Sequence, residues 1–144
     1  MDDEIKALFG KGHQPLFVYT QEHSTRVEGE QSIVSPEKPL FFKELSRLWT
    51  SVEGTMFKES NTLLVEILLE RFQKNPLGTG MLIPNWSGGE EDGTLRPSGD
   101  VCRILMQLSK SPSVAEFVRK TRSPHLPYVY VCPPHDTEER GGVE

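Results

Sequence analysis

The chain has 144 residues, of which 35% are hydrophobic and 26% charged, and its formal net charge is -5. That length suits one domain with a single core, and the negative charge argues against general attraction to nucleic acid or to an anionic membrane. No apolar run approaches the roughly 18 to 20 residues of a membrane span, and the acidic start Met-Asp-Asp-Glu is unlike a signal peptide. We therefore expect an intracellular protein, in the cytoplasm or nucleus, with no membrane contact.

The N-terminal part of the chain is predicted to hold a helix, a strand and a long loop. Early acidic residues and spaced apolar residues predict a short amphipathic helix over 2–9, and aromatic and β-branched residues predict a strand over 15–20. Apolar residues are sparse over 21–38, which indicates an exposed loop with a weak edge strand over 32–34. A loop of this length is usually functional or disordered, and the sequence leaves both alternatives open.

A helix is predicted over 39–52, because apolar residues recur there at the spacing i, i+4, i+7, i+8 and i+11. Pro39 suits the first turn of that helix, where a backbone N–H has no intrahelical partner. The short connection that follows favours antiparallel packing against the next helix.

The next predicted helix, over 60–75, is the expected centre of the fold, since it is the longest strongly apolar helical pattern in the chain. Leu64 and Phe72 belong to its main apolar row, and Glu66 and Glu70 lie on a narrow polar stripe. Burying each large apolar side chain contributes roughly 1.5 to 3 kcal/mol, so such a helix must be covered on several sides. A buried strand is the alternative, which the length and the helix-forming residues disfavour.

The second half of the chain is predicted to alternate strands and helices. A short apolar run predicts an edge strand over 81–84, and a polar, glycine-rich stretch predicts an exposed loop over 85–98. Apolar spacing predicts a helix over 100–109, and the Ser-Val-Ala-Glu sequence of a capping box begins another over 113–122.

We expect these elements to form a small single α+β domain over 1–136. About four helices then surround the central helix and pack on a few short strands, including one predicted over 127–132 from its alternating valines. A mostly helical bundle is the alternative architecture. Residues 137–144 are expected to form a flexible C-terminal tail.

The sequence lacks the usual catalytic signatures: it has no P-loop, no G-x-G-x-x-G and no G-x-S-x-G. Cys132 and His135 are weak candidates for metal ligands, to which His125 or Cys102 could be added. A structural zinc site normally needs four ligands from paired knuckles, and only one pair is present. We therefore expect reduced thiols, no metal and no cofactor, and we favour a non-catalytic protein over an enzyme.

Positive charge is concentrated between residues 96 and 122, and an indole lies in the polar loop before it. A basic surface of this kind can contact an acidic protein or a nucleic acid, or it can be a solvated helix end. Trp86 is either a lid over the core or an exposed anchor for a partner. The predicted partner-binding residues are Trp86, Arg103, Lys110, Arg119, Lys120 and Arg122.

Three serines, Ser35, Ser111 and Ser123, precede prolines and are candidate sites for a proline-directed kinase, although Ser-Pro pairs also start turns. With no convergent catalytic motif, the sequence favours a non-catalytic protein–protein interaction subunit or adaptor of a larger intracellular complex. The alternative is a nucleic-acid-binding accessory protein that uses the basic region 96–122. The sequence does not indicate an oligomeric state.

Overall fold

The computed structural model describes residues 12, 14–89 and 92–121. Within these residues the chain forms two small sheets, three α-helices and short 3₁₀ turns. The mixed content of helices and strands confirms the predicted α+β character, but the detail of about four helices around a central one is not confirmed. The predicted elements over 2–9, 127–132 and 137–144 lie outside the described residues.

The first sheet is a hairpin of β1 (Thr25–Gln31) and β2 (Pro39–Phe42), which pair antiparallel after a 3₁₀ turn, η1, over Gln21–His23. β1 lies inside the predicted 21–38 loop and takes up 7 of its residues. It was missed because most of its side chains are exposed, so the strand has no apolar face to reveal it. Backbone hydrogen bonds to β2 hold it instead.

Two further predictions in this region are wrong. The stretch 15–20 has no strand pairing. The predicted helix over 39–52 is the strand β2 followed by a short helix, α2 (Leu45–Trp49). The apolar residues at the start of this stretch also fit a strand that buries alternate side chains. In β2 the buried side chains are Leu40 and Phe42.

The second sheet pairs β3 (Leu64–Glu66) with β4 (Gly80–Leu82) in parallel. A 3₁₀ turn, η2 (Glu59–Asn61), precedes β3, and another, η3 (Leu69–Phe72), follows it. The predicted central helix over 60–75 is therefore wrong, whereas the strand predicted over 81–84 lies close to the observed β4.

Burial along 64–70 explains why this stretch is not helical. The side chains alternate with a period of two: Glu66 and Glu70 are buried, while Val65, Ile67 and Leu69 are 37%, 41% and 48% exposed. A helix would have placed both glutamates on its solvent side. The carboxylates instead bind groups far away in the sequence, Glu66 from the extended strand β3 and Glu70 from the 3₁₀ turn η3.

The main hydrophobic cluster lies where β4 meets the two longer helices, α3 (Asp100–Leu108) and α4 (Val114–Lys120). Met81, Val101 and Ile104 are each at most 3% exposed, and Phe117 packs against them. Both helices confirm the predictions over 100–109 and 113–122. The N-cap of α3 is Gly99.

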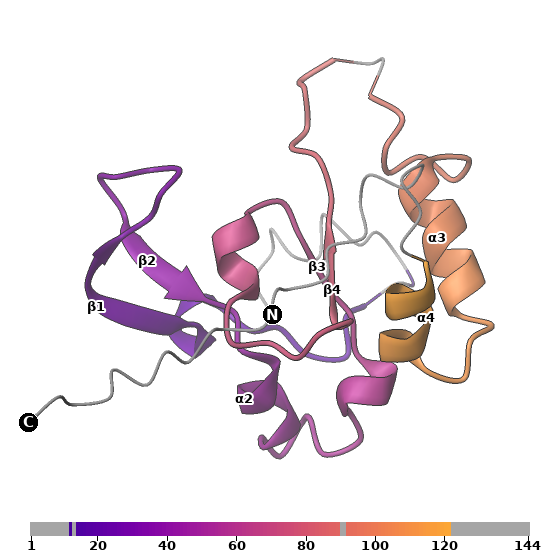
Figure 1. Ribbon diagram of the computed structural model, residues 1–144, viewed down its shortest axis with the longest axis horizontal. Coiled ribbons are helices and arrows are strands. Elements are labelled where there is room, and N and C mark those ends of the chain that lie inside the picture. Colours follow the sequence, from indigo (N-terminus) through magenta and orange to yellow (C-terminus); the bar gives the residue numbers. More distant parts are fainter. Residues whose placement is uncertain (1–11, 13, 90–91, 122–144) are drawn as a thin grey trace, which may run out of the picture.

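Figure 1 shows the β1–β2 hairpin at one end of the molecule and α3 with α4 at the other, with β3 and β4 between them. The chain after β4 rises away from this body before it returns to α3. Among the described residues, no helix combines the length and the hydropathy that crossing a bilayer requires.

Candidate binding sites

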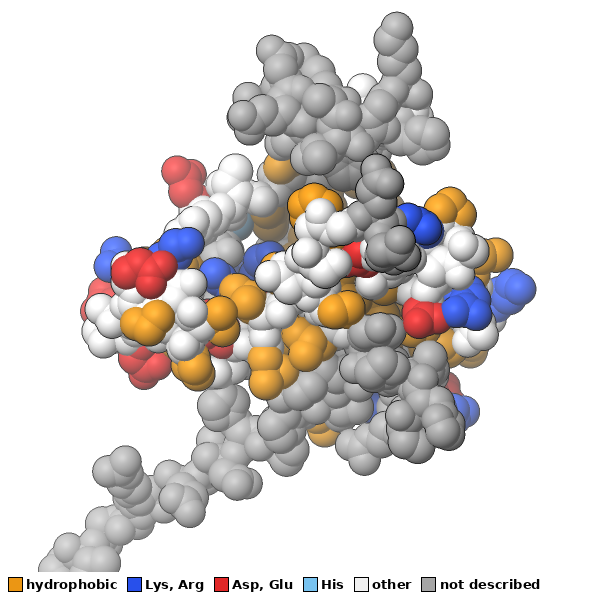
Figure 2. Space-filling view, turned by 90° about the horizontal axis from the view of Figure 1, so that it is seen from above, with side chains coloured by type: hydrophobic (Ala, Val, Ile, Leu, Met, Phe, Trp, Pro, Cys, Tyr) orange, Lys and Arg blue, Asp and Glu red, His pale blue; other side chains and the backbone are white. Residues whose placement is uncertain are grey.

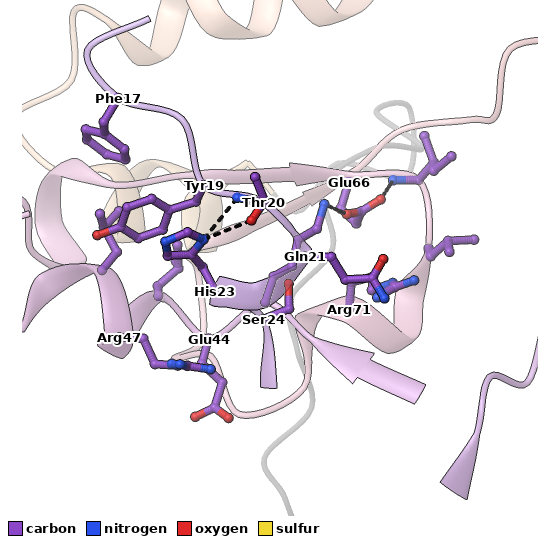
Figure 3. Close-up of a pocket in the computed structure, with 15 residues that line it drawn as sticks. Phe17, Tyr19, Thr20, Gln21, His23, Ser24, Glu44, Arg47, Glu66 and Arg71 are labelled. Atoms are coloured by element: carbon purple, nitrogen blue, oxygen red, sulfur yellow. Dashed lines mark hydrogen bonds and ion pairs between the residues drawn. The ribbon is translucent and has the colours of Figure 1, made fainter. Parts of the chain in front are cut away.

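The first pocket has a volume of about 530 Å³ and is lined by three parts of the chain: residues 17–24, residues 43–48 from the end of β2 into α2, and the stretch from β3 to η3. Figure 3 shows Tyr19 and His23 from the first part, Arg47 from α2, and Arg71 from η3 around it. Leucine and isoleucine side chains complete the lining. The pocket therefore combines apolar walls with several polar groups, which is the usual composition of a small-ligand site.

An ion pair between Lys43 and Glu66 forms part of the pocket lining, with 2.5 Å between Nζ and Oε2. Burial of the Glu66 carboxylate, the largest influence, raises its pKa. The hydrogen bonds from Lys43 and from the backbone N–H of Ile67, together with the positive charge of Lys43, outweigh burial, so the pKa lies below its ordinary value. Glu66 is therefore an anion at neutral pH, and it neutralises Lys43.

His23 is held in one tautomer by the backbone. The N–H of Thr20 donates to Nδ1 of His23 at 3.0 Å, and the imidazole stacks on the Tyr19 ring at a centroid distance of 4.2 Å. Because a backbone N–H can only donate, Nδ1 must be the unprotonated nitrogen, and in the neutral ring the proton lies on Nε2. Nε2 has no hydrogen-bond partner among residues 14–89 and 92–121, so it is available as a donor.

Arg47 and Arg71 bring two guanidinium groups to this pocket. Arg47 donates to Thr25 Oγ1 at 3.2 Å, and Arg71 donates to the carbonyl oxygen of Phe41 at 3.3 Å. Neither guanidinium is paired with a carboxylate in the part of the chain that the structure describes. The remaining acidic group of the lining, Glu44, lies 3.6 Å from Lys74.

A second pocket, of about 640 Å³, lies under the chain that follows β4. Its lining is mainly apolar and includes Ile83, Trp86 and Leu95, of which Trp86 is 72% exposed and Leu95 is 67% exposed. Ile67 lines both pockets and is therefore a wall common to the two.

Asp92 stabilises the fold of the loop that carries Trp86. Its carboxylate accepts hydrogen bonds from the backbone N–H groups of Thr94 at 3.0 Å and Ser87 at 3.1 Å. Hydrogen bonds from Thr94 and then from Ser87 lower the pKa of Asp92. The two arms of the loop are thereby held together next to Trp86.

The predicted partner-binding cations do not gather around Trp86: of the basic region 96–122, Arg96 lines its pocket, but Arg103, Lys110, Arg119 and Lys120 do not. Three of them are paired within the fold: Arg103 with Asp100, Arg119 with Glu59, and Lys120 with Glu116. Arg119 also donates to the carbonyl oxygen of Leu77 at 3.1 Å. Lys110 is exposed and has no carboxylate partner among the described residues, and Arg122 lies outside them. Figure 2 shows acidic and basic side chains next to one another at this end of the molecule.

The remaining candidates from the sequence are the serines that precede prolines and the cysteines and histidines considered as metal ligands. Ser35 is half-buried, and the Ser111 hydroxyl donates to the carbonyl oxygen of Ser113 at 3.1 Å. Cys102 is a free, half-buried thiol, and no cluster of three His, Cys, Asp or Glu side chains occurs within the described residues. Ser123, His125, Cys132 and His135 lie outside the described residues.

Sequence reasoning missed the first pocket. Its polar residues are far apart, from Tyr19 to Arg71, and no spacing along the chain relates them. Trp86 is different, because an indole in a polar loop stands out in the sequence. No protein-family model, no curated protein and no solved structure matches this chain.

Proposed function

We propose that this chain is a non-catalytic protein-interaction domain, acting as a subunit or adaptor of an intracellular complex, and that it binds an apolar side chain of a partner protein beside Trp86. The observation that carries the proposal is an indole, 72% exposed, on the wall of a mainly apolar pocket of about 640 Å³. Tryptophan is enriched among the residues that dominate binding energy, because it buries a large area at little conformational cost.

A row of exposed aliphatic side chains supports the same surface. Val65, Ile67 and Leu69 are all more than a third exposed, and Ile67 lines the Trp86 pocket. Figure 2 also shows hydrophobic side chains reaching the surface on the face that it draws. Contiguous exposed apolar surface in a protein is commonly a binding site. The proposed occupant is therefore an extended partner segment with at least one large aliphatic or aromatic side chain.

Nucleic-acid binding through the basic region 96–122 is the second proposal, and the ion pairs weaken it. A cation that already holds a carboxylate must give up that contact before it can neutralise a phosphate. Arg103, Arg119 and Lys120 are all in this position. This alternative requires an affinity for oligonucleotides that falls steeply as salt rises.

The substitution Trp86→Ala tests the first proposal. We expect it to weaken binding of the partner at least tenfold, since hot-spot aromatics contribute about 2 kcal/mol or more. Proteins captured from the source cells by the wild-type chain and by the variant are compared by quantitative mass spectrometry. The best candidate is then purified, and its Kd for both chains is measured by calorimetry.

Met106→Ala is the matched control, because Met106 is a large apolar side chain, 61% exposed, on the surface of α3. Partner binding that survives Met106→Ala and is lost with Trp86→Ala supports the proposed surface. Equal binding by the wild type and Trp86→Ala contradicts it. Salt-sensitive binding of an oligonucleotide that is lost with Lys110→Glu favours the second proposal instead.

A further inference from the structure

We infer that the first pocket binds a small organic anion, in which a carboxylate or phosphate group is attached to an apolar body. This site is separate in chemistry from the protein-binding surface at Trp86, although the two share Ile67 as a wall. The inference depends on the charge balance of the pocket, on one free hydrogen-bond donor, and on the apolar part of the lining.

The charge balance favours an anion. Three cations line the pocket, Lys43, Arg47 and Arg71, and Glu66 neutralises the first of them at 2.5 Å. Glu44 has its own partner outside the lining, Lys74. Two guanidinium charges therefore remain without a carboxylate among the described residues, on a chain whose net charge is -5. Because this local positive charge is opposite in sign to the net charge of the protein, the pocket attracts anions.

The hydrogen-bonding capacity of these groups fits the same ligand. Each guanidinium has five N–H donors in a planar fork, and Arg47 and Arg71 each use one nitrogen, Nη1, to donate to a neutral oxygen, at 3.2 Å and 3.3 Å respectively. The Nε2–H of His23 adds a donor, because the Thr20 N–H occupies the other ring nitrogen. The planar fork of donors on each guanidinium matches the geometry of a carboxylate or phosphate group.

The remaining lining determines what the anion is attached to. Leu45, Leu48, Ile67 and Leu68 contribute side chains to the wall, and Phe17 and Tyr19 contribute aromatic rings. The volume of about 530 Å³ is within the roughly 300 to 1,000 Å³ typical of small-molecule sites. An inorganic ion would leave this apolar surface in water, whereas an organic anion covers it.

The test is calorimetric titration of the full chain with four probes: phenyl phosphate, benzoate, inorganic phosphate and phenol. We expect phenyl phosphate or benzoate to bind at least tenfold more tightly than both inorganic phosphate and phenol. The comparison of phenyl phosphate with benzoate tells which anionic group the pocket prefers. Binding of neither, or equal binding of phenol, overturns the inference.

Arg47→Gln is the diagnostic variant, because Arg47 is exposed and its removal leaves the core intact. We expect it to weaken binding of the preferred probe at least tenfold, with Arg71→Gln as a second variant and thermal melts as a check that both fold. Lys110→Gln is the control for an exposed cation away from the pocket. If Lys110→Gln weakens binding as much as Arg47→Gln, only diffuse charge attraction is present and the inference fails.

The failure of this inference can be told from the failure of the proposed function. Trp86→Ala should leave the affinity for the small anion within twofold of the wild type, and Arg47→Gln should leave capture of the protein partner within the same range. Loss of anion binding in Trp86→Ala overturns the separation of the two sites.

Discussion

Two glutamates, Glu66 and Glu70, bring their carboxylates into the interior, where groups from earlier in the chain hold them. Glu70 is 4% exposed and accepts hydrogen bonds from Ser32 Oγ at 2.6 Å and from the backbone N–H of Ile33 at 2.8 Å. Glu66 accepts from Lys43 and from the N–H of Ile67. A buried carboxylate is tolerated only when such donors replace its water, so both residues fix the path of the chain around them.

Glu66→Gln removes the negative charge but keeps the shape of the side chain, and we expect it to lower the free energy of unfolding at pH 7 by about 1 to 3 kcal/mol. The pKa of Glu66 is depressed in the folded protein, so the stabilisation is fully present above the unfolded pKa, roughly 4.3. It is lost as the pH falls through the lower folded value. Urea unfolding of both proteins between pH 7 and pH 2.5 measures this difference.

The control for that series is Glu30→Gln, since Glu30 is exposed on β1. Its stability should follow that of the wild type at every pH. A difference between wild type and Glu66→Gln that stays constant down to the lowest pH would show that the ion pair with Lys43 does not contribute.

Among the elements, α3 and α4 could be predicted from the sequence because the signals that define them lie inside or next to the helices themselves. Apolar residues recur at helical spacing in α3, and in α4 the Ser113 hydroxyl accepts a hydrogen bond from the N–H of Glu116 at 3.3 Å, as the capping box predicts. The other half of the capping box does not form, because the N–H of Ser113 donates to Ser111 Oγ at 3.5 Å and the carboxylate of Glu116 is 2.5 Å from Lys120 Nζ.

The stretch 60–75 could not be predicted in this way, because contacts between distant residues determine its structure. β3 is extended by its pairing with β4, and the side chains of Glu66 and Glu70 find donors more than 20 residues away. The residues themselves favour a helix, so the tertiary contacts override the local preference. The first pocket was hidden for the same reason, whereas Trp86 is identifiable from its polar surroundings alone.

Ser113→Ala tests the cap of α4. Without the hydroxyl, the N–H of Glu116 loses its partner at the start of a helix of 7 residues, and we expect the free energy of unfolding to fall by about 1 kcal/mol. Chemical denaturation followed by circular dichroism measures the loss. Ser109→Ala is a suitable comparison, because Ser109 is exposed and lies at the C-terminal end of α3. An effect of Ser113→Ala no larger than that of Ser109→Ala would contradict the role of the cap.

On the scale of the whole molecule, α4 is fastened to the middle of the chain in two ways. Arg119 reaches Glu59 in η2 and the carbonyl oxygen of Leu77, but this pair is about half exposed and contributes little. The second is the close packing of Gly78 against the backbone of α4. A Cβ atom added at Gly78 would lie only 2.7 Å from the carbonyl oxygen of Ala115. Gly78 also has a φ of +87°, a conformation that other residues adopt at a cost.

Gly78→Ala should therefore destabilise the fold more than Arg119→Gln does. We expect a loss of about 2 to 4 kcal/mol for Gly78→Ala, from the positive φ and the steric conflict together, and of less than about 1 kcal/mol for Arg119→Gln. Thermal and urea unfolding of the two variants gives the comparison. If Arg119→Gln is the more damaging change, the attachment of α4 depends on charge and not on close packing.

The position of Ile67 between the two pockets has a thermodynamic consequence. Because Ile67 lines both pockets, an occupant that turns this side chain also changes the wall that the occupant of the other pocket meets. By thermodynamic linkage this influence is reciprocal: each occupant changes the dissociation constant of the other by the same factor. A single isoleucine would then be the point of communication between a metabolite-sized molecule and a macromolecular assembly.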